Sequence, residues 1–541
     1  MDKRVDTYKE RLEQLQSARS SFNAQWDEVS KVVRPAAASF CSPFNTTGKK
    51  QDGMLMDGVG QHSNELLAAG FYSLLTNPST QWFDLATSDP ALNSQRAVQI
   101  WLREVARIMF FEIQRPQTGF TTSLHELYLD HGAYGNGVMF ITESPDLSSL
   151  AFMALPLQES YFIENDRGQV VSLYRHYTRT VAQLVERFGM EGVHEAVAQA
   201  FANNRRNETV QVLHVIEPNA SRGLTDRSIH KEYSSLYMDL TNGHFMHQSG
   251  FDEKPFMAVR FYKSTNEIYG RGPGSSALAD LKMLQEILKT TLRGAQKVVD
   301  PPLMAPDQGY LSNIRVNPGG VTYFRRGLSQ DDRLQPLITG GRPELGEQLA
   351  AGIRQRVQEI FYVDQLQLNQ GPQMTATEVL QRTEEKMRLM GPVVGRAQTE
   401  LLGPCIQRVF GLLSRAGRLP SPPQELIESG AKLQIVYTSP FAKSQDQTEA
   451  NGLLRVQQMI TPFVSVDPTV MDVFDTEAIA RGLGEMYAIN PKYFRTQEDV
   501  QALRQQRANA QQQQEMMQQL EMLKTGSEGV AALAKGSAMV G

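Results

Sequence analysis

The chain has 541 residues, which is enough for several domains or subdomains. Its formal net charge of −5 argues against a surface coated with cations for tight DNA binding. Two cysteines, Cys41 and Cys405, are too few for a disulfide framework and indicate a reducing compartment. The first residues lead into a polar helix rather than a signal region, and no apolar run is long enough to span a membrane. The composition therefore indicates a soluble, cytosolic protein of mixed helices and strands.

The first element in the chain is an amphipathic helix predicted over residues 6–34, which Pro35 ends. The polar loop 36–53 contains Thr47-Gly-Lys-Lys50, which has part of a phosphate-binding loop pattern. The match fails, because Pro43 stands where that motif needs glycine and Lys50 stands where it needs Ser or Thr. An ATPase that depends on this motif is therefore not indicated.

Helices follow over about 59–76, 93–115 and 119–133. The last contains His125-Glu126 and His131. Zinc proteases place their two histidines four residues apart on one helical face, whereas here the spacing is six. We therefore expect surface or capping histidines, no metal site and no cofactor. The glycines at 132, 135 and 137 predict a turn into a strand over 138–141.

Short strands with alternating apolar and polar residues dominate residues 150–265, as in half-buried antiparallel sheets. Asp166-Arg167-Gly168 and Asn242-Gly243 are typical of hairpin turns. One helix, 180–188, and the polar loop 202–207 interrupt the strands. The predicted strands cover residues 151–154, 160–163, 170–174, 209–215, 234–240 and 256–261.

A helix, a Pro/Gly-rich excursion and a second helix occupy residues 266–364. The first helix runs from about Ser275 to Val299 and stops at Pro301-Pro302, and the second runs from Pro343 to about Tyr362. The excursion between them contains a strand-like run, 321–324, and so long a connection is usually functional. Each helix has an apolar stripe. The stripe residues of the two helices that are predicted to pack between subunits are Leu281, Leu284, Leu288, Leu292, Leu349, Ile353 and Val357.

A mostly basic stripe lies beside the apolar one. Its cations are the candidates to face a channel: Lys282, Lys289, Arg293, Lys297, Arg354 and Arg356. The simpler interpretation is two amphipathic helices with solvated charges. The alternative is that the helices pack against copies of themselves and line or flank a channel. The sequence leaves open which cations would face it.

The remainder of the chain is predicted to be mainly helical. A nearly uncharged loop over 363–373 precedes a helix that Thr375 and Glu378 start with a capping box. Gly391-Pro392 kinks or divides this helix, which continues to about Arg415. A strand over 433–437 and helices over 445–460, 475–488 and the Gln-rich 497–524 follow, and the last residues are small.

The run from Ile268 to Pro302 resembles the portal, or head-to-tail connector, proteins of short-tailed bacteriophages. So do Met374–Val379, the stretch from Leu67 to Phe83, and the opening helix with Trp26. The resemblance covers at least residues 8–437. It implies a dodecameric ring at one capsid vertex, with a central channel through which double-stranded DNA is packaged and ejected. The cations of the basic stripe are then the candidate contacts to this DNA.

The fold class is α+β, and the resemblance supplies names for its parts. It implies an α/β wing, a two-helix stem, a small β-containing clip and a helical C-terminal crown. These parts are expected as a wing at 1–265, a first stem helix at 266–300, a clip at 301–342, a second stem helix at 343–363, a tunnel loop at 364–374, a kinked helix and the rest of the wing at 375–465, a crown at 466–525 and a tail at 526–541.

The resemblance also implies a tunnel loop that narrows the channel, and neutral side chains there would let DNA slide. An ordinary linker is the simpler interpretation. The tunnel-loop candidates are Asp364, Gln365, Gln367, Asn369, Gln370 and Gln373.

The implied partners are other copies of the chain, double-stranded DNA bound without sequence preference, terminase, scaffold and major capsid protein, a tail adaptor, and internal core or ejection proteins. No membrane is expected. The protein would be made in the host cytoplasm and end at the head–tail junction of the virion. It would be a structural channel rather than an enzyme. The alternatives are a nuclease or ATPase of the packaging machine, for which no motif is present, and a neck adaptor ring, whose chains are usually shorter.

Overall fold

The computed structural model describes residues 3–35, 55–93, 95–143, 150–219, 230–304, 323, 335–337, 342–366, 390–430 and 433–437, with scattered residues between 452 and 512. The chain forms two compact units. The larger comprises Met1–Trp82, Arg107–Leu419 and Ser439–Phe441, and the smaller comprises Phe83–Ala106, Pro420–Thr438 and Ala442–Gly541. Both contain helices and antiparallel strands, which confirms the α+β class.

The helices of the larger unit follow the apolar spacing of the sequence. They are α1 (Lys3–Val33), α2 (Val59–Leu75), α5 (Phe120–Tyr134), α6 (Val181–Phe188), α7 (Glu195–Ala202), α8 (Pro273–Ser276), α9 (Leu278–Val299), α10 (Pro343–Ile360), α11 (Val363–Leu366) and α13 (Gly403–Arg415). Short turns of other helix types are η2 (Pro116–Thr118), η3 (Leu157–Glu159) and the π-helical η6 (Gln398–Leu402). None of the helices among the described residues is long and apolar enough to cross a membrane.

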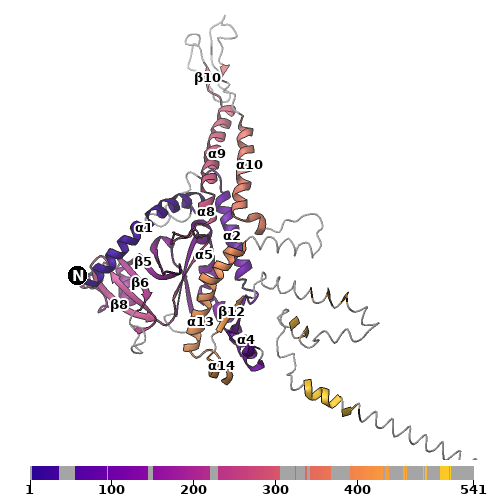
Figure 1. The fold of residues 1–541 in the computed structure, drawn as a ribbon. Coiled ribbons are helices and arrows are strands. Elements are labelled where there is room, and N and C mark those ends of the chain that lie inside the picture. Colours follow the sequence, from indigo (N-terminus) through magenta and orange to yellow (C-terminus); the bar gives the residue numbers. More distant parts are fainter. Residues whose placement is uncertain are drawn as a thin grey trace, which may run out of the picture. The chain divides into compact units, whose positions relative to one another are not determined.

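A five-stranded antiparallel sheet has the order β4-β5-β6-β7-β8. Its strands are β4 (Ser160–Glu164), β5 (Val170–Thr180), β6 (Thr209–Pro218), β7 (Tyr233–Asp239) and β8 (His244–Phe251). The turns between β4 and β5 and between β7 and β8 have Gly168 and Gly243 at positive φ, as the sequence predicted. Figure 1 shows α1 beside this sheet.

Apolar side chains pack against both faces of the five-stranded sheet. Neighbouring residues of β6 point to opposite faces, so they join different clusters. Leu213 and Val215 pack with Val5 and Leu12 of α1. Val212, on the other face, joins a separate cluster with residues of α6 and α7. The strand β8 and the helix α7 were not predicted. α7 is only eight residues long, too short for its apolar spacing to stand out.

A three-stranded antiparallel sheet has the order β3-β2-β9, with β2 (Asn136–Glu143), β3 (Leu150–Ala154) and β9 (Phe256–Arg260). All five residues of β9 are buried, so the prediction of a half-buried, alternating strand is wrong there. β9 pairs with β2 in the plane of the sheet and lies against η6. Trp26 of α1 is fully buried nearby and donates to the Tyr134 carbonyl over 3.1 Å.

The smaller unit contains β1 (Phe83–Thr87) paired antiparallel with β12 (Leu433–Tyr437), as well as α3 (Pro90–Asn93) and α14 (Gln424–Ser429). The Asn93 side chain accepts from the Thr87 backbone N–H over 2.8 Å and so ties α3 to β1. The helix α4 (Arg96–Ile113) runs from this unit into the larger one. The strand predicted over 433–437 is confirmed.

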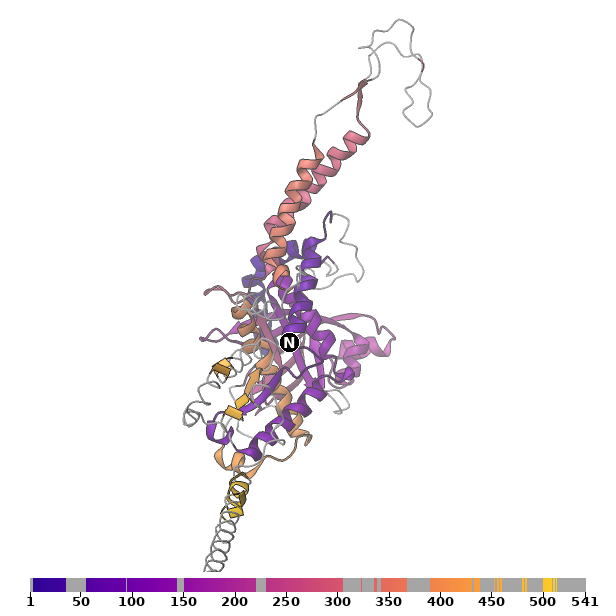
Figure 2. The same ribbon diagram turned by 90° about the vertical axis from the view of Figure 1, so that its right-hand side faces the viewer.

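α9 and α10 run side by side, as Figures 1 and 2 both show. Beyond them, β10 (Leu303–Met304) and β11 (Gln335–Pro336) form a two-residue antiparallel ladder. The strand-like run at 321–324, apart from Tyr323, and the capping box at Thr375 and Glu378 lie outside the described residues. So do most of the helices predicted after residue 445, although residues 500–507 are helical.

Candidate nucleic-acid interface

The start of α9 lies directly on the turn between α5 and β2. Gly135 of that turn has φ +77°, and a Cβ on Gly272 would lie 2.7 Å from the Gly135 nitrogen. The Asn136 side chain binds both backbone groups of Gly270, accepting from its N–H over 2.8 Å and donating to its carbonyl over 2.9 Å. Only glycine permits so close a backbone approach, so this run anchors the chain just before α8 and α9.

The residues predicted to pack in the paired helices divide into two groups. Those nearest the start of α9 and the end of α10 are buried within the single chain, and Leu281 contacts Gly60 of α2. Those farther along are not, since Leu292 is 51% exposed and Leu349 is 55% exposed. The buried members are Leu281, Leu284, Ile353 and Val357, and Leu288 is half-buried. The far half of the pair therefore presents apolar side chains without cover among the described residues.

The basic candidates divide in the same way. Lys282 lies 2.6 Å from Glu28 of α1, and Arg356 lies 3.3 Å from Asp280. Lys289 is paired with Glu286 at 3.3 Å within α9. Arg293 and Lys297 are exposed and have no ion-pair partner in the described part of the chain.

Arg354 belongs to a cluster that ties both helices to the segment before α2. Its Nε donates to Asp57 over 2.7 Å, and its Nη1 donates to Glu347 over 2.7 Å. Gln285 of α9 accepts from the Met56 N–H over 2.6 Å and donates to the Asp57 carbonyl over 3.0 Å. The second Asp57 carboxylate oxygen accepts from the Val59 N–H at the start of α2. Sequence patterns contain no signal for this cluster, since residues 57, 285 and 354 are far apart in the chain.

The loop predicted over 363–373 begins as a helix. Asp364 and Gln365 lie in α11, and Leu366 packs against Gly70 of α2, where a Cβ would lie 2.7 Å from it. The helix forms because Tyr362, at φ +59°, turns the chain sharply after α10 and lets a new turn start at Val363. Gln367, Asn369, Gln370 and Gln373 lie outside the described residues.

Of the two histidines of α5, His125 is exposed as the sequence predicted, whereas His131 is not. His131 is buried rather than superficial, and its ring contacts Phe71 and Phe261. Burial lowers the pKa of His131 to about 3, so the ring is neutral at physiological pH. Within the described ranges no group of three His, Cys, Asp or Glu side chains could hold a metal ion.

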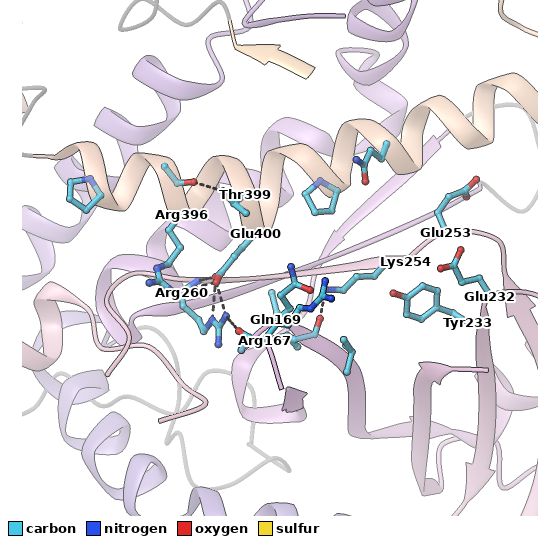
Figure 3. A pocket seen from close by; sticks show the side chains of 18 residues that line it. Arg167, Gln169, Glu232, Tyr233, Glu253, Lys254, Arg260, Arg396, Thr399 and Glu400 are labelled. Atoms are coloured by element: carbon cyan, nitrogen blue, oxygen red, sulfur yellow. Dashed lines mark hydrogen bonds and ion pairs between the residues drawn. The ribbon is translucent and has the colours of Figure 1, made fainter. Parts of the chain in front are cut away.

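A pocket of roughly 710 Å³ lies in the larger unit, between the strands around β9 and the helix formed by η6 and α13. Figure 3 shows Arg396, Thr399 and Glu400 projecting from that helix towards Arg260. Arg260 is the centre of this wall: it donates to Glu400 over 2.6 Å and to the Gly168 carbonyl over 2.9 Å, and it also pairs with Glu164. The side chain of Arg260 is buried, and both carboxylates compensate its charge.

Lys254 lies on the same pocket (Figure 3), where its ammonium donates to the Val170 carbonyl over 2.5 Å. It also lies 4.6 Å from the centroid of the Phe256 ring. Burial lowers the pKa of Lys254 to about 8. Its neighbour Glu253 is held by Arg408 over 2.6 Å and by Arg415 over 2.8 Å. The sequence singled out none of these groups, because the pocket unites three segments that are distant in the chain, between residues 167 and 407.

The family model described as "Bacteriophage head to tail connecting protein" matches residues 5–494. The chain therefore belongs to the bacteriophage head-to-tail connecting protein family, as its resemblance to portal proteins predicted, and it is a virion component at the head–tail junction. It is 31% identical over 539 residues to the "Probable portal protein" of Bordetella phage BPP-1, covering 96% of this chain and 93% of the relative.

A second relative is the "Portal protein" of Salmonella phage epsilon15, which is 30% identical over 547 residues, with 98% of this chain and 96% of the relative covered. A chain of the solved structure titled "Virion of native gene transfer agent (GTA) particle" aligns over 82% of this chain and 90% of its own length. That likeness, at 11% identity and a TM-score of 0.35, is too weak to carry an argument.

Proposed function

We propose that the chain is the subunit of a phage portal, a closed ring that joins head to tail and through which double-stranded DNA enters and leaves the capsid. The observation that carries the proposal is the match to portal proteins over nearly the whole of both relatives. A portal built this way is a structural channel without chemistry of its own. Heterologous contacts between identical subunits generate a ring when the rotation between them closes.

The paired helices α9 and α10 support this role as the stem. Their far halves expose Leu292 and Leu349, which neighbouring stems would cover in a ring. Their cations, repeated around the ring, would make weak contacts to phosphates that do not depend on sequence. Arg293 and Lys297 are the most available of these cations, while the others have partners within the chain.

The remaining parts take the names of a portal subunit. The sheets and helices before residue 266 would form the wing, residues 301–342 the clip, residues 364–374 the tunnel loop, and residues 466–525 the crown. The clip would contact the terminase during packaging and the tail adaptor afterwards. Scaffold, major capsid protein and internal ejection proteins complete the set of proposed partners.

Mass photometry of the purified chain, followed by end-on class averages, tests the proposal. Twelve copies of the 60.6 kDa chain would weigh roughly 0.73 MDa and form a closed ring. A bore wide enough for duplex DNA is the expected result. A compact dimer that hydrolyses ATP or cleaves DNA would refute the portal and support a packaging enzyme.

A further inference from the structure

The pocket at Lys254 contains a cation without a matching carboxylate. The acids in its lining are largely committed, since Glu400 binds Arg260 and Glu253 binds Arg408 and Arg415. No carboxylate among the described residues lies within 4.0 Å of the Lys254 ammonium, whose acceptor is the Val170 carbonyl. An ammonium can donate three hydrogen bonds, so this one has donors to spare.

Arg167 adds a second such charge to the pocket. It follows β4 in the turn that Gly168 completes, it is exposed, and its guanidinium has no ion-pair partner in the described ranges. Arg396, also in the lining, pairs with the same Glu400 that binds Arg260. Its Nη1 lies 3.3 Å from the Glu400 carboxylate. The pocket therefore has a local excess of positive charge in a chain whose net charge is −5.

A half-buried lysine without a counter-ion costs stability, because the ammonium gives up water and gains little in return. Burial is expected to be compensated by an opposite charge. Glu400 acts on Lys254 at longer range, but it also binds Arg260 and Arg396, so a further carboxylate from outside the described chain would complete the compensation. The volume of roughly 710 Å³ has room for a side chain together with the backbone that carries it.

We infer that this pocket is a socket between subunits, in which Lys254 and Arg167 bind an acidic side chain of a neighbouring copy of this chain. A second copy is the favoured occupant because it carries a surplus of acids and because a ring holds it at a fixed position beside each subunit. Glu232, which also lines the pocket, would repel a doubly charged phosphate more than a single carboxylate. The inference rests on the proposed function, since it requires an assembled ring.

Carbodiimide coupling in rings of mixed isotope composition tests the inference. Unlabelled and ¹⁵N-labelled chains are mixed before assembly and cross-linked, and the joined peptides are identified by mass spectrometry. Lys254 should give peptide pairs of mixed isotope composition, because its carboxylate partner lies on another subunit. Lys263 is the matched control: it lies 2.6 Å from Glu164 of its own chain and should give pairs of one isotope only.

Lys254→Gln provides a second measurement, since the amide can still donate to the Val170 carbonyl. We expect the variant to keep or raise the thermal midpoint of the unassembled chain and to form rings at least tenfold less well at low salt. Rings that form normally while Lys254 couples only within its own chain would overturn the inference and leave the portal intact. The inference is equally overturned if Lys254 couples to no carboxylate and inorganic phosphate shields it from acetylation. A chain that forms no ring at all would refute the proposed function and the socket with it.

Discussion

A close approach between α9 and α10 can be tested with one methyl group. A Cβ on Gly346 would lie 3.1 Å from Cβ and 3.2 Å from Cγ2 of Thr291, and it would overlap the Thr291 hydroxyl. Alanine normally stabilises a helix interior by about 1 kcal/mol over glycine, whereas overpacking costs about 1–3 kcal/mol. Gly346→Ala should therefore cost up to about 2 kcal/mol. Gly352→Ala, in the same helix with nothing within 4 Å of its Cβ, should gain about 1 kcal/mol.

Native-state hydrogen exchange of the amides in α9 and α10 measures both effects, because separation of the helices opens their backbone bonds to solvent. Protection should fall in Gly346→Ala and rise in Gly352→Ala. Adding Thr291→Ala to Gly346→Ala removes the overlapping hydroxyl and Cγ2 and should restore most of the loss. Equal protection in the two glycine variants would refute the close packing of the pair.

Three further predictions concern assembly, DNA and pH. Leu292→Asp and Leu349→Asp, at side chains more than half exposed, should abolish rings while changing the thermal midpoint of the unassembled chain by less than about 2 °C, which mass photometry and calorimetry check. Arg293→Gln and Lys297→Gln should lower DNA packaging or retention and leave ring formation unchanged; unaltered packaging in both would make these cations structural. Lys254→Met should stabilise the unassembled chain by about 1 kcal/mol below pH 8, because folding lowers the pKa of Lys254 from 10.5 to about 8. The gain should fade between about pH 8 and 10.5, where the folded wild type sheds the buried charge, and urea titrations across this range would show it.

Local signals in the sequence were sufficient for most of the elements. The apolar spacing of residues 6–34 predicted α1 to within three residues, and Pro343 marked the start of α10. Asn242-Gly243 predicted the β7–β8 hairpin even though β8 itself, with its polar residues, was not recognised as a strand. These features depend on neighbours in the chain, which a single sequence displays.

What the sequence did not predict depends on contacts between distant segments. Arg260 ends an apolar strand, and nothing near it indicates that Glu164 and Glu400 compensate its charge. The same holds for the link from Arg354 to Asp57, almost three hundred residues away. The π-helical turn at Gln398–Leu402 belongs here too, since it places Glu400 against β9 and the backbone N–H of Arg260.

The arrangement of charges along the stem suggests why a basic stripe need not be a uniform DNA contact. Near the base, Lys282 and Arg354 have carboxylate partners on α1 and on the segment before α2, and removing either cation would leave a carboxylate without its partner. Farther along, Arg293 and Lys297 have no such partner among the described residues, and the exposed Leu292 lies beside them. One helix therefore combines a base that is paired within the chain with a far half whose apolar and basic side chains are uncovered among the described residues. Under the proposed function, other subunits and DNA would contact this far half. Neutralising a base cation should accordingly alter the angle of the stem, whereas neutralising a far cation should alter only how DNA moves past it.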